Sequence, residues 1–314
     1  MRRQRHFCLI GLCVFVLRAA AAPWSGVTSD LPPDPSVRWG TLANGLRYAV
    51  MPNAEPKGRV SLRLLVAAGS LHETDDEQGL AHFIEHMAFR GTKAYPRGAL
   101  VPALEHAGIA LGPDNTAFTT NSFTIYHLEL PDGHEPTLRL GLGVFREYAG
   151  AISFDPDLIE IERGVILSEK DSRNTPDARV SQANQELLWP GSRLVRRPPI
   201  GKEENIRHFT REQFKAFYDA WYRPERMAVV MVGDFTTDDG ARLIGEIFSP
   251  LQARAPARPE PDDLVTAAAS RPNIVVYGDP GWAGVTFALE HASRPAEAAD
   301  THARRVAPLH RTLA

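Results

Sequence analysis

Residues 79–92 read GLAHFIEHMAFRGT, an apolar run that carries two histidines and a glutamate within five positions. His82, Glu85 and His86 are spaced at i, i+3 and i+4, which places all three on one face of a helix. The apolar residues of the same helix form an adjoining stripe: Leu80, Phe83, Ile84 and Met87. Burying titratable side chains costs free energy unless a partner compensates. The stretch therefore predicts a helix that packs by one side and presents a paired polar group on another.

A metal ion is the partner that this spacing favours. Two imidazoles one helical turn apart can bind one zinc ion, and Glu85 between them can hold a water molecule. The pattern HxxEH is the inverted relative of HExxH, with the base at the other end of the motif. A catalytic zinc has a third protein ligand, which must come from another segment.

Residues 155–171, DPDLIEIERGVILSEKD, can supply that ligand. The opening Asp-Pro pair is typical of a helix N-terminus. Glu162 and Glu169 lie two turns apart on a seam that also carries two isoleucines, so both carboxylates need a cation or a metal. A zinc ion held by His82, His86 and Glu169 would make this placement favourable, with Glu162 as a supporting carboxylate.

Each candidate also has a purely structural interpretation. The two histidines could be ordinary hydrogen-bonded side chains, and Glu85 a solvated helix residue. The two glutamates of the second helix could pair with Arg163 and Lys170 in that helix, or with basic residues elsewhere. The remaining histidines considered have no ligand spacing, and we expect structural or exposed roles for them: His72, His106, His127 and His208.

The first 22 residues have the pattern of a secretory signal peptide. Three early arginines precede the apolar run FCLIGLCVFVL at 7–17, and small residues at 19–22 offer cleavage sites. An uncleaved N-terminal anchor is the alternative. Both cysteines, Cys8 and Cys13, lie inside this segment, so the mature chain is expected to have no disulfide. Once the segment is cleaved, no membrane span is expected either. The 35 basic and 38 acidic residues are scattered, which argues against nucleic acid as a partner.

Strand and helix patterns mix without a regular βαβ rhythm. This favours an α+β fold, a two-layer sandwich of a mainly antiparallel sheet packed by helices. Thr74 and Glu77 have the spacing of a capping box, so a helix is expected to begin near Asp75. Strands are expected in a hairpin around Asn44-Gly45, at 59–70, at 227–235, and as one long strand at 117–131. Further helices are expected at 137–151, at 155–171, after Thr210, and at 238–251.

Composition divides the chain into five segments. The signal peptide (1–22) and an irregular lead-in (23–36) precede one domain at 37–252, which a Pro-rich linker (253–272) follows. Residues 273–314 are predicted to be the incomplete start of a second similar α+β domain, because so few residues cannot form an independent core.

Three motifs that follow one another along the chain resemble those of the pitrilysin-type zinc metallopeptidases. This family includes insulin-degrading enzyme and mitochondrial processing peptidase. The motifs are GLAHFIEHMAFRGT at 79–92, ERGVILSE at 162–169, and PIGKEENIRHFTREQFKAFYDAWYRPERMAVVMVGDF at 199–235. The similarity runs from Val37 to Leu251. It implies one zinc ion per chain on His82, His86 and Glu169, with Glu85 as the catalytic base and Glu162 as an important carboxylate that does not bind the metal.

The resemblance also implies a peptide-binding edge strand. The family pattern there reads Asn-Ala-aromatic-Thr, whereas this chain has NTAFT at 115–119, with Thr116 in place of the expected asparagine. The expected substrate-binding residues are Asn115, Ala117 and Phe118.

The function expected from these observations is a zinc-dependent endopeptidase that hydrolyses peptides or small unfolded proteins in the bacterial periplasm. Family members usually enclose the substrate in a two-half chamber, so we expect either a truncated or interrupted gene product or a partner chain that supplies the second half. The alternatives are a non-catalytic peptide-binding or assembly subunit, an inactive truncated fragment, and a zinc site that serves stability alone.

Overall fold

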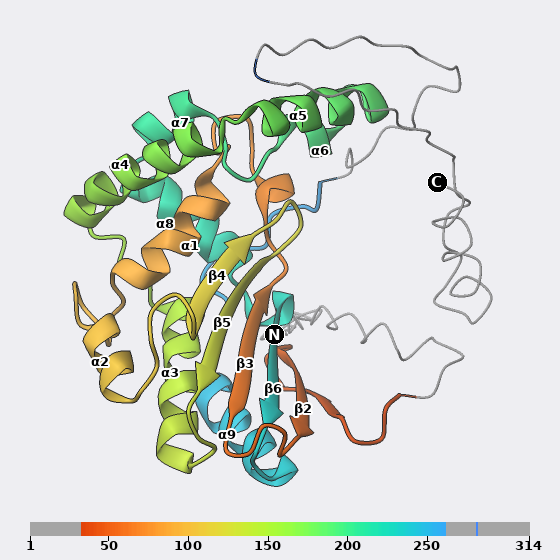
Figure 1. Ribbon diagram of the computed structural model, residues 1–314, viewed down its shortest axis with the longest axis vertical. Coiled ribbons are helices and arrows are strands. Elements are labelled where there is room, and N and C mark those ends of the chain that lie inside the picture. The colour runs from red at the N-terminus through yellow and green to blue at the C-terminus, as the bar shows by residue number, and fades with distance from the viewer. Residues whose placement is uncertain (1–32, 262–280, 282–314) are drawn as a thin grey trace, which may run out of the picture.

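The computed structural model describes residues 33–261 and residue 281 (Figure 1). Its strands form one six-stranded sheet in the order β1-β2-β6-β3-β5-β4. The strands are β1 (Arg38–Thr41), β2 (Arg47–Pro52), β3 (Val60–Val66), β4 (Asn115–Thr119), β5 (Thr124–Leu130) and β6 (Met227–Gly233). Neighbours are antiparallel except β2 and β6, which run parallel. The prediction of a mainly antiparallel sheet packed by helices is confirmed.

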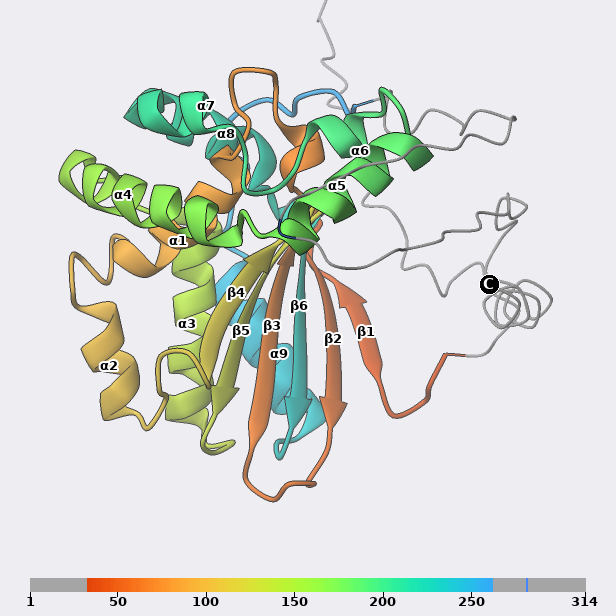
Figure 2. The same ribbon diagram turned by 45° about the horizontal axis from the view of Figure 1, so that its top comes forward.

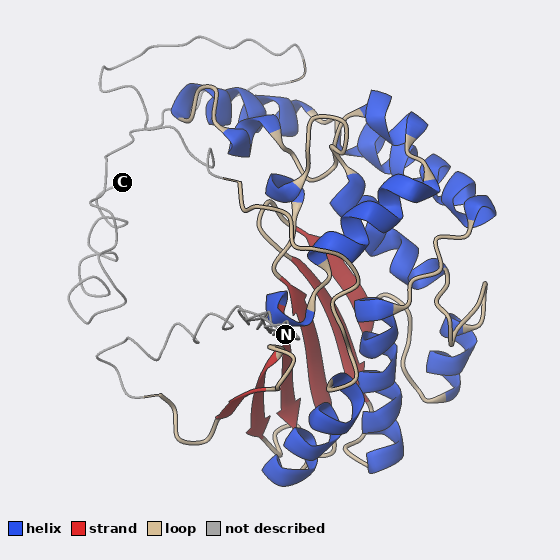
Figure 3. Cartoon of the chain, turned by 180° about the vertical axis from the view of Figure 1, so that it is seen from behind, coloured by secondary structure: helices blue, strands red, loops and turns tan. Residues whose placement is uncertain are grey.

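The helices form two groups. α3 (Glu135–Gly150) and α9 (Thr237–Phe248) lie along one face of the sheet, which Figure 3 shows from behind. The second group gathers beyond one end of the strands (Figure 2). It consists of α1 (Leu80–Arg90), α4 (Pro156–Arg173), α5 (Pro176–Leu188), α6 (Arg193–Arg196), α7 (Glu203–His208) and α8 (Arg211–Trp221). α2 (Leu100–His106) lies to the side, and short 3-10 turns occur at η2 (Ser70–His72) and η3 (Pro224–Arg226). The sheet and this terminal group of helices meet at α1.

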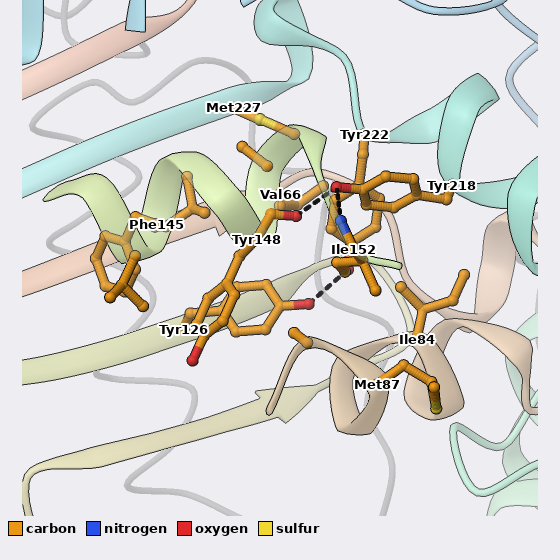
Figure 4. Close-up of a cluster of buried hydrophobic side chains, with 14 of the residues drawn as sticks. Val66, Ile84, Met87, Tyr126, Phe145, Tyr148, Ile152, Tyr218, Tyr222 and Met227 are labelled. Carbon is orange, nitrogen blue, oxygen red and sulfur yellow. Dashed lines mark hydrogen bonds between the residues drawn. The ribbon is translucent and has the colours of Figure 1, made fainter. Parts of the chain in front are cut away.

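The core joins the sheet to α1. Alternate residues of β3 and β5 are buried, as expected for strands with one covered face. All four residues of the predicted apolar stripe on α1 are fully buried, which confirms it. Figure 4 shows Ile84 and Met87 of this stripe beside a group of buried tyrosines. The Tyr126 and Tyr222 hydroxyls lie 2.8 Å apart, so these phenols are buried with a hydrogen-bond partner.

Two predicted elements are wrong in their limits. The helix expected near Asp75 begins only at Leu80, because Gly79 has a φ of 102° and interrupts any helix before it. Thr74 and Glu77 instead close a turn, in which the Thr74 N–H donates to the Glu77 carboxylate. The single strand expected at 117–131 is a hairpin of β4 and β5, with its turn at residues 120–123.

Several predictions concern residues outside the described part. These are the signal peptide at 1–22, the lead-in up to residue 32, the linker from 262 on, and the second domain at 273–314 apart from residue 281. The described part of the linker is tied to the domain, since Arg254 pairs with Asp219 and Arg258 with Glu77. Within residues 33–261, no helix is long and apolar enough to cross a bilayer.

Candidate metal centre

The start of α1 is held by a buried carboxylate. Glu73 is fully buried and accepts hydrogen bonds from the backbone N–H groups of Gly79 and Ala81, at 3.0 and 2.9 Å. A negative charge is favourable at this end of a helix, where free N–H groups point outward. Burial nevertheless raises the pKa of the Glu73 carboxyl group to about 8. Glu73 and the left-handed Gly79 together set where the helix begins.

α4 lies beside α1 and carries the two glutamates of the seam. The Asp155 side chain accepts hydrogen bonds from the N–H groups of Asp157 and Leu158, which starts the helix. Glu162 is almost completely buried, whereas the Glu169 side chain is 23% exposed. Both glutamates lie on the side of α4 that faces α1.

His82, His86 and Glu169 converge on one point. Their ligand atoms all lie within 4.8 Å of one another, and they are the one such group of His, Cys, Asp or Glu in the described residues. Oε2 of Glu169 is 3.7 Å from Nε2 of His82 and 3.4 Å from Nε2 of His86. In a tetrahedral zinc site with bonds near 2 Å, ligand atoms are about 3.3 Å apart. Oε2 of Glu169 is also buried without a hydrogen bond, so the three atoms fit a zinc ion.

The second nitrogen of His86 is bound by Glu162. Nδ1 of His86 lies 2.8 Å from Oε1 of Glu162, and Arg90 forms an ion pair with the other oxygen. Although burial opposes it, the bonds from His86 and Arg90 hold the pKa of Glu162 below its usual range. Burial alone would lower the pKa of His86, but Glu162 and the nearby carboxylates raise it. This arrangement turns Nε2 of His86 toward the metal position.

His82 is the more buried of the two imidazoles. Its ring centroid lies 4.6 Å from that of His86, and the ring planes make an angle of 72°. Burial, with a smaller effect of His86, lowers the pKa of His82 to about 3. His82 is therefore neutral at physiological pH, which is the form that binds a metal.

Glu85 lies next to this group and is 6% exposed. Burial raises the pKa of its carboxyl group, and a hydrogen bond from the Thr119 hydroxyl opposes the shift. That hydroxyl donates to Oε2 of Glu85 at 2.6 Å. A cleft of about 340 Å³ opens beside Glu85 and His86, and Phe89 and Val165 contribute to its lining. A buried carboxylate with a raised pKa, adjoining a cleft, is suited to proton transfer.

The three candidate substrate-binding residues lie on β4 in different environments. Asn115 is 2% exposed, and neither atom of its carboxamide makes a hydrogen bond. Ala117 is half-buried and lines the cleft, together with Asn115. Phe118 is 44% exposed and contacts the rings of Phe123 and His127. Phe118 thus lies on the opposite face of β4 from Asn115 and Ala117.

The two glutamates do pair with basic residues, Glu162 with Arg90 and Glu169 with Arg173, but not with Arg163 and Lys170. Arg163 pairs with Glu160, and Lys170 donates to the carbonyl of Gly201. Sequence reasoning missed Glu73, Arg90, Thr119 and Arg173; the last of these pairs with Glu169. The threonine that ends the NTAFT segment was the one available signal for Thr119, because the family pattern ends with threonine.

Two family models match the chain. "Insulinase (Peptidase family M16)" matches residues 48–189, and "Peptidase M16 inactive domain" matches residues 208–290. The "Probable zinc protease PqqL" of Haemophilus influenzae is 39% identical over 238 residues, which is 76% of this chain and 26% of the relative. The protein of that name from Escherichia coli is 35% identical over 254 residues, or 81% and 27% of the two chains. The chain thus spans about a quarter of the length of these curated relatives.

Solved structures of proteases are similar to this chain as well. The crystal structure of the first half of the periplasmic protease PqqL from Escherichia coli superposes with a TM-score of 0.70 at 36% identity. The match covers 74% of this chain and 50% of that one. A mutant of the ferredoxin protease FusC, in complex with Arabidopsis ferredoxin, gives a TM-score of 0.68 at 32% identity, over 73% and 26% of the two chains.

Proposed function

The chain belongs to the insulinase family of peptidases, family M16, and from this premise we propose that it forms the metal-binding part of a zinc-dependent endopeptidase. The observation that supports the proposal most is the convergence of His82, His86 and Glu169 beside a buried Glu85. Relatives named as zinc proteases support the same class of reaction.

One zinc ion per chain would be held by His82, His86 and Glu169. When bound, zinc lowers the pKa of its water ligand and polarises the carbonyl group of the peptide bond. The neutral His82 is ready to bind the metal without losing a proton. Glu162 fixes the His86 ring through Nδ1 and so keeps Nε2 available.

Glu85 acts as the general base and then as the general acid. Its carboxylate takes a proton from the attacking water and later donates that proton to the nitrogen of the leaving amine. Burial raises the pKa of Glu85 above its ordinary value, which favours uptake of a proton by its carboxylate.

A peptide substrate would bind along β4. This strand pairs with β5 on one side and is an outer strand of the sheet in the described part of the chain. A peptide can therefore add as a further strand, and main-chain pairing suits an enzyme that accepts many sequences. Ala117 and Asn115 would lie toward the cleft, and Phe118 would contact the substrate from the other face.

Export to the bacterial periplasm and a partner chain are part of the proposal. PqqL of Escherichia coli is described as a periplasmic protease, and residues 1–22 have the pattern of a signal peptide. Because the relatives are about three times as long as this chain, a second half would complete the substrate chamber from the same or a partner chain. The ferredoxin bound to FusC supports small proteins, besides peptides, as substrates to test.

The test is zinc content and turnover of fluorogenic peptides, with and without the second half. Glu85→Gln should keep zinc and lose cleavage, whereas His82→Ala and Glu169→Gln should lose zinc. Peptide binding without turnover in either assembly would favour the alternative, a non-catalytic binding or assembly subunit. Cleavage by Glu85→Gln at the wild-type rate would refute the mechanism, and zinc-dependent melting without turnover or peptide binding would leave a purely stabilising metal.

A further inference from the structure

Thr119 is the last residue of β4 and the group that contacts Glu85 from the sheet. Its hydroxyl oxygen lies 2.6 Å from Oε2 of Glu85, which is a short, charge-assisted hydrogen bond when Glu85 is ionised. The contact joins the end of β4 to the middle of α1, across a sequence separation of 34 residues.

A count of protons fixes the direction of this bond. A hydroxyl group has one proton, and an ionised carboxylate can only accept. Thr119 lies 3.3 Å from the Thr124 hydroxyl, which itself donates to the carbonyl of Ala68 at 3.0 Å. The proton of Thr124 is thus used elsewhere, and that of Thr119 is directed to Glu85.

The bond restricts the carboxylate of Glu85. The terminal torsion of a glutamate is broad and has no sharp preferred angle. A donor on Oε2 holds the plane of the carboxylate and leaves Oε1 as the oxygen available for proton transfer. We propose that Thr119 is a positioning residue for the catalytic base, which orients Glu85 from the strand that borders the cleft. The inference rests on the proposed function, since it assigns Thr119 a role in that reaction.

Three variants of the full chain test this role. In Thr119→Val, which keeps the shape and removes the hydroxyl, we expect kcat to fall roughly ten- to hundredfold, as for a misaligned catalytic group. KM, zinc content and melting temperature should stay near wild type. Thr119→Ser restores the hydroxyl and should recover most of the lost kcat. Thr124→Val is the matched control, because it removes the neighbouring hydroxyl without a bond to Glu85, and its kcat should stay near wild type.

Equal losses in Thr119→Val and Thr124→Val would mean that the hairpin needs both hydroxyls for its structure, and would overturn the inference. A wild-type kcat in Thr119→Val would also overturn the inference. That result would leave the proposed function intact. Crystal structures of wild type and Thr119→Val give a readout that does not depend on turnover. The Glu85 carboxylate should be rotated or split over two orientations in the variant, and an unchanged single orientation would contradict the proposal even if no peptide is cleaved.

Discussion

Nδ1 of His86 lies 2.8 Å from Oε1 of Glu162, so one helix orients a metal-binding candidate on another. Partners of this kind fix the tautomer of a ligating histidine and raise its basicity. The zinc site is therefore expected to depend on a residue that does not touch the metal.

Replacing Glu162 should weaken the metal site. In Glu162→Gln we expect zinc affinity to fall roughly 10- to 100-fold, the usual effect of losing such a partner. Competition with a chelator measures this, and circular dichroism checks that the fold is kept. Glu160→Gln is the control, because Glu160 lies on the same helix, is exposed, and pairs with Arg163 rather than with a histidine. Equal affinities in the two variants would contradict the role of Glu162.

Zinc affinity should fall as the pH is lowered. The pKa of His86 is raised above its ordinary value of 6.5, and a proton on His86 competes with the metal. Below that pKa the affinity should drop by about tenfold per pH unit. His82, with a pKa of about 3, should add nothing between pH 6 and 8. Chelator competition over that range would show a slope for wild type, and a flat profile would argue against this assignment.

Glu73 should make stability depend on pH. Its pKa is raised from 4.5 to about 8 in the folded protein, so the folded state holds a proton that the unfolded state has lost. The stabilisation is complete below pH 4.5 and decreases as the pH rises toward 8, by up to about 1.4 kcal/mol per pH unit. Urea denaturation at several pH values should show this loss in wild type. The loss of stability with rising pH should be weaker in Glu73→Gln and retained in Glu77→Gln. An identical pH profile in all three proteins would count against the role of Glu73.

Two glycines with almost the same backbone conformation give a matched pair. Gly201 and Gly191 have φ values of 73° and 72°, but only at Gly201 would a Cβ overlap the backbone of Gly79. Gly191→Ala should cost about 1–2 kcal/mol, the strain of a left-handed alanine. Gly201→Ala should cost more and also weaken zinc binding, because Gly79 sets the start of α1. Equal unfolding free energies would show that the contact with Gly79 has no effect.

The local parts of the fold and of the site could be predicted from the sequence. The apolar stripe of α1 and the positions of the two carboxylates on α4 follow from helical periodicity, which depends only on spacing. The start of α1 could not, because Glu73 and Gly79 act through contacts that the Thr74–Glu77 pattern does not contain. The hairpin of β4 and β5 was hidden by β-forming residues on both sides of its turn. Arg90 became visible only once the distance between α1 and α4 was known, whereas Arg173 lies four residues from Glu169 on α4 and its pairing follows from spacing.

The position of β6 has a consequence for how the chain is made. β6 lies between β2 and β3, yet it follows them by more than 150 residues in the sequence. A nascent chain on the ribosome cannot complete the centre of the sheet until residues 227–233 have emerged, so two strand edges wait unpaired during synthesis. Exposed edges of this kind invite pairing with other chains. Under the proposed export, in which the chain crosses a membrane before it folds, the two edges would stay unformed until all six strands are available.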